Sequence, residues 1–205
     1  MLESTFKFFL INYWRSIDKK IFICFLILFI LGLFFSFSST SFLAGERLNK
    51  DYYFFFTKHF FFTFLAITIM VFISIIRTEI ITKFVTPMFI ISFILLLIVP
   101  IIGVEVKGAK RWIDFYFFRL QPIEILKPLF ILMTVKILTL DKFKNSQMKY
   151  FLSFLLLCLV IILLVDQPDL GQSILIIGSW VFTVFISGVS ILFLLAFFSI
   201  FVISL

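Results

Sequence analysis

The sequence predicts an all-α protein whose helices cross a membrane as a bundle. Of its 205 residues, 63% are hydrophobic and only 14% are charged, and the mean hydropathy is +1.24. A water-soluble domain of this length has too little interior to bury so much apolar surface. The apolar residues also form long runs separated by short polar segments, which is typical of successive transmembrane helices.

Seven apolar segments predict seven helices, because a helix needs about 20 apolar residues to cross the hydrocarbon core. Basic residues precede the first segment, as in a signal peptide, but six more spans follow, so we expect an uncleaved helix. We expect one integral membrane domain over residues 1–205, with no soluble domain inserted. The expected spans are 21–38, 54–76, 84–102, 122–140, 150–165, 172–187 and 190–205.

The positions of Lys and Arg predict the orientation, because cytoplasmic loops are enriched in basic residues. With a cytoplasmic N-terminus, ten basic residues lie inside: Lys7, Arg15, Lys19, Lys20, Arg77, Lys83, Lys136, Lys142, Lys144 and Lys149. Seven lie outside: Arg47, Lys50, Lys58, Lys107, Lys110, Arg111 and Arg119. Four of these seven belong to the loop 103–121, against the trend. We attribute the net charge of +7 to anchoring at lipid headgroups and expect no nucleic-acid partner.

The segment 108–127, GAKRWIDFYFFRLQPIEILK, gathers charged side chains between two apolar spans. Charge near hydrocarbon costs free energy, so such a cluster usually marks a functional region. Glu124 and Lys127 share a helical face and form either a functional or a mutually neutralising pair. Trp112 is either an interfacial aromatic residue or a wall of a substrate groove.

Two related motifs, Gln121-Pro122-Ile123-Glu124 and Gln167-Pro168-Asp169, are expected to open the fourth and sixth helices, with proline suited to the first position. Both helix starts then face the outer side, where their dipoles and nearby cations suit a phosphate or diphosphate. Alternatively, the two carboxylates only complement the helix dipoles. The sequence contains no Gly-rich phosphate loop, no Cys/His metal pattern and no nucleophile triad.

Three blocks in this order resemble the SEDS family (shape, elongation, division and sporulation) of bacterial membrane proteins, the FtsW/RodA/SpoVE group. The blocks are GAKRWI at 108–113, QPIE at 121–124 with Lys127, and QPDLG at 167–171. The segment WRSID at 14–18 and Lys127-Pro128 are more similar to the division-type branch, FtsW. The resemblance covers essentially the whole chain.

The resemblance implies a fold of about ten helices, of which about seven are present. It implies a peptidoglycan glycosyltransferase that acts on lipid II, the undecaprenyl-diphosphate-linked precursor, in septal cell-wall synthesis and cell division. Implied partners are a class B penicillin-binding protein and other division proteins. The implied location is the bacterial cytoplasmic (inner) membrane at the division site, multi-pass, with the N-terminus cytoplasmic. By position, the resemblance assigns substrate binding to Lys110, Arg111, Trp112, Gln121, Glu124, Lys127 and Asp169.

The chain departs from the family pattern in two respects. Ile123 replaces the usual Ser, and the family's catalytic Asp belongs to a large outer loop after the seventh helix, whereas this chain stops at Leu205. We therefore assign no catalytic residue and expect the N-terminal portion of such an enzyme, inactive alone. The cofactor stays open, since a divalent cation suits a diphosphate but no ligand cluster is present. A lipid II flippase and a non-catalytic division scaffold remain alternatives.

Overall fold

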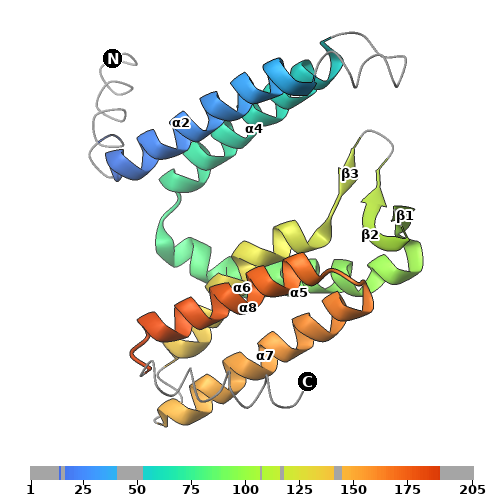
Figure 1. Ribbon diagram of the computed structural model, residues 1–205. Helices are drawn as coiled ribbons and strands as arrows, with labels where there is room; N and C mark the ends of the chain where they lie inside the picture. Colours follow the sequence, from blue (N-terminus) through green and yellow to red (C-terminus); the bar gives the residue numbers. More distant parts are fainter. Residues whose placement is uncertain are drawn as a thin grey trace. The chain divides into compact units, whose positions relative to one another are not determined.

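The computed structural model describes residues 14, 17–40, 53–106, 108–115, 118–140 and 145–189 (Figure 1). Most of the described residues are helical, and four of the described helices are long and apolar enough to cross a membrane. The predicted helical membrane class is thus confirmed. The expected last span, 190–205, lies outside the described residues. Contacts divide the chain into two compact units, residues 1–77 and 78–205, so a single domain stays a prediction.

The first unit contains helices α2 (Lys19–Phe35) and α4 (Phe54–Ile75), and α2 continues into the π-helical turn η1 (Ser36–Thr40). Helix α2 begins where it does because the Asp18 side chain accepts hydrogen bonds from the backbone N–H groups of Lys20 and Ile21, at 2.9 and 3.2 Å. Both helices are apolar on all sides and expose most of their surface. Such surfaces are stable only against lipid or other apolar partners.

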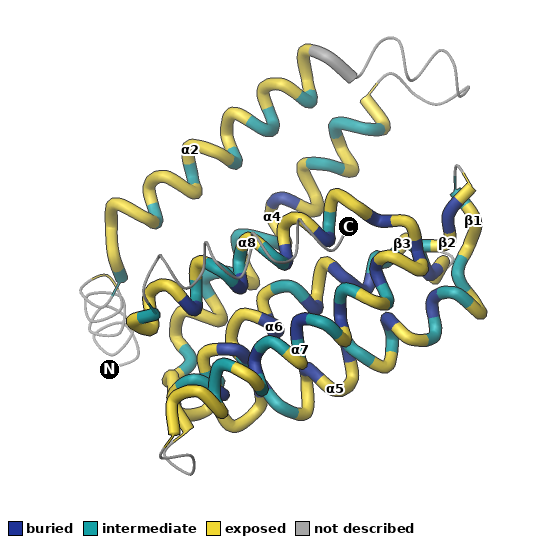
Figure 2. Tube along the Cα trace, turned by 60° about the horizontal axis from the view of Figure 1, so that its bottom comes forward, coloured by how far each residue is buried: buried dark blue, intermediate teal, exposed yellow. Residues whose placement is uncertain are grey.

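The second unit is a bundle of α5 (Thr78–Ile102), α6 (Pro122–Leu138), α7 (Ser146–Asp166) and α8 (Leu170–Ile186). Helix α6 contacts the other three helices, and its buried residues recur every three or four positions from Pro122 to Ile137 (Figure 2). The centre of the bundle is fully buried and apolar. It includes Leu96 of α5, Leu126 and Phe130 of α6, Val160 and Leu164 of α7, and Ile176 of α8.

Polar side chains join the helices of this bundle at specific points. Lys136 of α6 donates to the Thr82 carbonyl and the Thr86 hydroxyl of α5, at 2.9 and 2.8 Å. Trp180 of α8 donates its indole N–H to the Ser153 hydroxyl of α7 at 3.3 Å. Within lipid there is no hydrophobic driving force that brings helices together. Hydrogen bonds of this kind and close packing therefore determine the positions of the helices.

A small antiparallel sheet connects α5 to α6, where the sequence had indicated only a loop. Its strands are β1 (Val104–Val106), β2 (Ala109–Asp114) and β3 (Arg119–Leu120), in the order β1-β2-β3. Gly108, with φ of 80°, adopts the left-handed conformation that a tight hairpin connection requires. Ala109 and Ile113 are buried on β2. The pairing provides hydrogen-bond partners for backbone N–H and C=O groups of this connecting segment.

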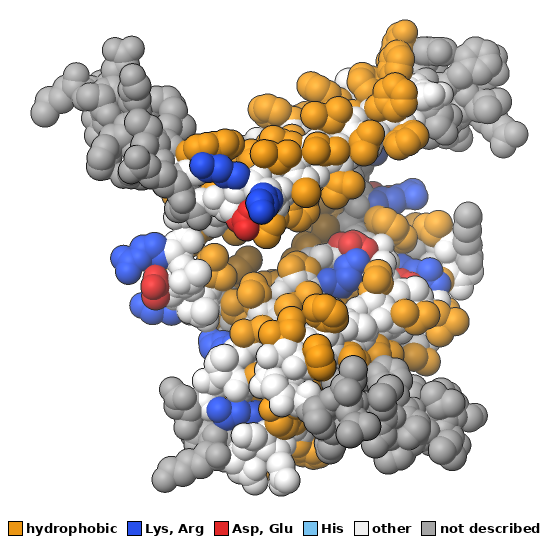
Figure 3. Space-filling model, turned by 60° about the vertical axis from the view of Figure 1, so that its left-hand side comes forward, with side chains coloured by type: hydrophobic (Ala, Val, Ile, Leu, Met, Phe, Trp, Pro, Cys, Tyr) orange, Lys and Arg blue, Asp and Glu red, His pale blue; other side chains and the backbone are white. Residues whose placement is uncertain are grey.

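Hydrophobic side chains cover much of the face shown in Figure 3, and charged side chains form a few separate groups. Large apolar residues are exposed along every described helix, including Phe72 of α4, Ile162 of α7 and Phe182 of α8. An exposed surface of this kind is expected where lipid is the solvent.

The core of the second unit provides a test of the fold. We predict that Phe130→Ala, at a fully buried position, lowers the free energy of unfolding by roughly 3 kcal/mol, because the lost ring leaves a cavity among α5, α7 and α8. Phe182→Ala is the matched control, since Phe182 is 67% exposed. Unfolding in detergent, followed by tryptophan fluorescence, measures both. Equal effects of the two variants would contradict the packing described for α6.

Candidate functional site

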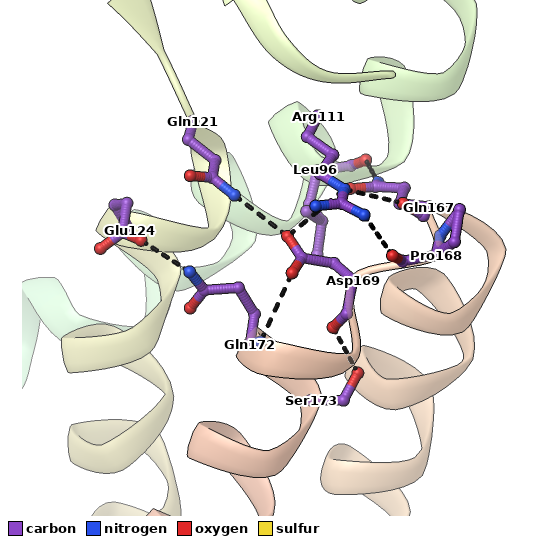
Figure 4. Close-up of polar contacts among 9 residues, drawn as sticks. All are labelled: Leu96, Arg111, Gln121, Glu124, Gln167, Pro168, Asp169, Gln172 and Ser173. Carbon is purple, nitrogen blue, oxygen red and sulfur yellow. Dashed lines mark hydrogen bonds and ion pairs between the residues drawn. The ribbon is translucent and has the colours of Figure 1, made fainter. Parts of the chain in front are cut away.

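A cluster of polar and charged side chains lies where β2, the start of α6 and the junction of α7 with α8 meet (Figure 4). All of these elements belong to the second unit. The start of α6 and the start of α8 are joined directly by a hydrogen bond from Gln121 to Asp169. The expectation that these two helix starts face the same side is thus confirmed.

Asp169 is the centre of this cluster and is only 7% exposed. It is the N-cap of α8, where its carboxylate accepts a long hydrogen bond of 3.5 Å from the backbone N–H of Gln172. The Ser173 hydroxyl donates to the Asp169 carbonyl at 2.9 Å. A carboxylate at this position satisfies free N–H groups of the first helical turn and complements the helix dipole.

Two side chains from outside α8 also bind the Asp169 carboxylate, through its Oδ2 atom. Gln121, the N-cap of α6, donates its amide N–H at 3.1 Å. The Arg111 Nε atom of β2 lies 3.8 Å away and forms an ion pair. A buried carboxylate needs this compensation because an unpaired charge in a dry environment is strongly destabilising.

Arg111 binds the chain before α8 as well as the Asp169 side chain. Its Nε atom donates to the Gln167 carbonyl at 3.1 Å, and one terminal nitrogen donates to the Pro168 carbonyl. These carbonyls follow the last turn of α7, where backbone acceptors have no partner within the helix. The guanidinium group therefore ties β2 to the α7–α8 junction.

The strand register explains how Arg111 reaches that junction. Val104 pairs with Trp112 and Glu105 pairs with Lys110, so Arg111 is the additional residue on β2. This irregularity is a β-bulge, a feature that redirects a side chain and is common beside functional sites.

A second ion pair lies one turn into α6. Lys127 Nζ and Glu124 Oε2 are 2.7 Å apart, which confirms that these residues share a helical face. The amide of Gln172 in α8 donates to the other oxygen of Glu124, Oε1, at 3.0 Å. The Lys127 side chain is 23% exposed and that of Glu124 is 50% exposed. This pair therefore lies at the surface of the bundle, whereas Asp169 is buried.

The structure brings five of the seven predicted residues together. Arg111, Gln121 and Asp169 form one set of contacts, and Glu124 and Lys127 form a second. Lys110 and Trp112 lie on β2 beside Arg111, and Lys110 is exposed while Trp112 is partly buried. Their part in the site stays a prediction.

One expectation about the helix starts is wrong. Pro122 does occupy the first position of α6, after the cap Gln121. In the second motif, however, α8 begins at Leu170 and its cap is Asp169, so Pro168 precedes the cap. The helix therefore starts two positions later than expected, and the Asp169 carboxylate accepts from the backbone N–H of Gln172 in its first turn.

Sequence reasoning did not assign Gln167 or Gln172 to the site. The buried Gln167 side chain donates to the Leu96 carbonyl of α5 at 3.1 Å and so fixes the α7–α8 junction. Gln172 lies three residues after Asp169, on the same face of α8, and this spacing was the signal available for it. In the described part of the chain, no three His, Cys, Asp or Glu side chains are placed to hold a metal ion.

Comparison with known proteins places the chain in a family. Residues 18–205 match the family described as cell cycle protein, which groups FtsW, RodA and SpoVE. A probable peptidoglycan glycosyltransferase FtsW of Wigglesworthia glossinidia brevipalpis is 33% identical over 178 residues, which cover 85% of this chain and 46% of that protein. The peptidoglycan glycosyltransferase MrdB of Escherichia coli K12 is 34% identical over 126 residues, covering 62% of this chain and 34% of the relative.

Solved structures show the same fold. A chain of a peptidoglycan synthase complex, studied for the coordination of polymerization and crosslinking, matches with a TM-score of 0.70 and 23% identity, over 88% of this chain and 51% of that one. The rod shape determining protein RodA of Thermus thermophilus matches with a TM-score of 0.53 and 27% identity, over 63% of this chain and 43% of RodA. The chain thus spans about half the length, or less, of the proteins it matches. It is a multi-pass membrane protein and belongs to the SEDS family, the FtsW/RodA/SpoVE group of cell cycle proteins.

Proposed function

We propose that the chain binds lipid II as part of a peptidoglycan glycosyltransferase of cell division. The observation that carries this proposal is the partly exposed ammonium group of Lys127 inside an apolar bundle, one turn below the adjoining starts of α6 and α8. A lipid-linked diphosphate needs both an apolar surface for its chain and fixed cations for its phosphates. The names of relatives such as FtsW and MrdB support this substrate class.

The residues of the site have two kinds of role in this proposal. Arg111, Gln121 and Asp169 bind one another and hold the two helix starts in place. Lys127, with Glu124, borders the space that the diphosphate would enter, and Lys110 and Trp112 lie on the strand beside it. In this proposal Lys127 is the cation that binds a phosphate oxygen. Arg111 does not bind the ligand but holds the start of α8 in place.

The reaction that the family resemblance implies joins sugars into a glycan strand, with a lipid diphosphate as leaving group. Cations that hold the diphosphate favour this step because they stabilise the charge that develops on the leaving group. The proposal gives this chain the binding part of that reaction. A penicillin-binding protein that crosslinks the product is the proposed partner, and the similarity of the fold to a chain of a peptidoglycan synthase complex that coordinates polymerization and crosslinking supports it.

The first test concerns Lys127. We predict that Lys127→Ala weakens binding of lipid II to the chain in nanodiscs about tenfold, the loss of one charge-assisted hydrogen bond, while Lys127→Arg keeps most of the affinity. Lys83→Ala is the control, because Lys83 is an exposed residue of α5 outside the cluster. A wild-type chain that does not bind lipid II, or a Lys127→Ala variant that binds normally, would contradict the proposal.

The second test separates the two roles at position 111. We predict that Arg111→Ala and Arg111→Lys both lower the free energy of unfolding, by roughly 2 kcal/mol for the alanine variant, because a lysine cannot reproduce the forked contacts with two carbonyls and Asp169. Thermal unfolding and lipid II affinity are measured together. An Arg111→Lys variant of normal stability, paired with an Arg111→Ala variant whose only defect is affinity, would instead make Arg111 a direct ligand of the diphosphate.

The third test addresses orientation, since the proposed substrate side is the outer face. In a chain whose Cys24 and Cys158 are replaced by Ser, we predict that Lys110→Cys reacts with a membrane-impermeant maleimide in intact spheroplasts. Gln147→Cys, at the exposed start of α7, should react only after lysis. The positive-inside bias supports this outcome. Labelling in the reverse order would place the cluster at the cytoplasmic face.

A further inference from the structure

Gln172 forms hydrogen bonds with a carboxylate of each of the two ion pairs of the site. Its backbone N–H donates to Asp169 Oδ1, and its side-chain amide donates to Glu124 Oε1 on the neighbouring helix (Figure 4). Asp169 is paired with Arg111, and Glu124 is paired with Lys127. The side chain of Gln172 therefore connects α8 to the charged pair on α6.

The two oxygens of Glu124 are held by different helices. Oε2 lies 2.7 Å from Lys127 Nζ, within α6, and Oε1 accepts from Gln172 Nε2 of α8 at 3.0 Å. A half-exposed glutamate has several staggered side-chain conformations open to it. The contact with Lys127 moves with α6, whereas the contact with Gln172 fixes the carboxylate relative to a second helix.

The amide of Gln172 is oriented for this contact at a cost. Among the described residues, its Oε1 atom is buried and has no hydrogen-bond partner. A buried acceptor without a partner costs free energy, so packing alone would favour an apolar side chain at this position. If the Gln172 amide were flipped, its oxygen would face the Glu124 carboxylate oxygen, and two acceptors would repel each other. The benefit that offsets this cost is the hydrogen bond that the Gln172 amide donates to Glu124.

We infer that Gln172 is a positioning residue that fixes the Glu124 carboxylate and, through it, the ammonium group of Lys127. Gln172 donates to Oε1 of Glu124, and Lys127 lies against Oε2. The ammonium group has three N–H donors, and this restricted contact leaves donors for another anion. Without Gln172, Glu124 can turn both oxygens onto Lys127 and neutralise it more completely. The consequence for a diphosphate ligand rests on the proposed function.

The first measurement requires no ligand. The side-chain carboxyl carbons of glutamate are labelled with ¹³C in the 205-residue chain in nanodiscs, and the Glu124 signal is identified by its loss in Glu124→Gln. We expect Gln172→Leu to shift or broaden this signal. Gln147→Leu is the matched control, because Gln147 also lies in the first turn of a helix but is exposed. An unchanged Glu124 signal in Gln172→Leu overturns the inference.

The second measurement uses undecaprenyl diphosphate in nanodiscs of a neutral phospholipid. We expect Gln172→Leu to weaken binding about fivefold, less than the loss of Lys127 itself, since the cation remains but is more fully neutralised. In a Glu124→Gln background, Gln172→Leu should cause no further loss, because Gln172 acts through Glu124. Thermal unfolding of each variant is recorded beside the affinity. A purely structural role would lower stability without this dependence on Glu124.

The outcomes distinguish the inference from the proposed function. A wild-type chain that does not bind undecaprenyl diphosphate contradicts the proposed function, and the Glu124 signal alone then decides whether Gln172 positions that carboxylate. A fivefold loss that persists in the Glu124→Gln background makes Gln172 a direct ligand contact and overturns the inference. If Gln172→Leu shifts the Glu124 signal but leaves the affinity unchanged, Gln172 positions Glu124 but not Lys127, and that part of the inference is overturned.

Discussion

The buried carboxylate of Asp169 is the constraint on which the arrangement of the second unit depends. A charge that is 7% exposed in an apolar bundle must be compensated in place. Three elements supply that compensation: Arg111 from β2, Gln121 from the start of α6, and the backbone of the first turn of α8. Each donor fixes one element relative to the others. The positions of the strand and both helix starts thus follow from one unfavourable charge.

The need to compensate the buried Asp169 carboxylate also explains the sheet between α5 and α6. Arg111 reaches Asp169 and the carbonyls of Gln167 and Pro168 from a strand, at a bulge that interrupts the pairing of β1 with β2. A strand fixed by its neighbours places a side chain more reproducibly than a free loop does. Arg111, one of the basic residues that run against the charge bias of the chain, therefore has a task in the fold. The family resemblance had assigned it to substrate binding.

The sequence predicted the helical membrane class of the described residues, because lipid imposes a simple rule on the length and composition of the helices that cross it. It also predicted the Glu124–Lys127 pair, since their spacing is local to one helix. It did not predict the sheet, because strands of two to six residues carry too little alternation to be recognised beside long apolar runs. The contacts of Arg111 join residues 56 or more positions apart. Such pairings depend on tertiary structure, which local patterns do not encode.

Helix α6 is held by polar contacts at both of its ends. Gln121 binds Asp169 at its first turn, and Lys136 binds Thr82 and Thr86 of α5 near its last turn. Between these points the helix packs through apolar side chains such as Phe130. Dispersion contacts alone allow a helix in lipid to slide or rotate at modest cost, whereas hydrogen bonds to fixed partners do not. The Glu124–Lys127 ion pair, one turn below the first of these contacts, is consequently fixed along and around the helix axis, as the proposed binding of a lipid-linked diphosphate requires.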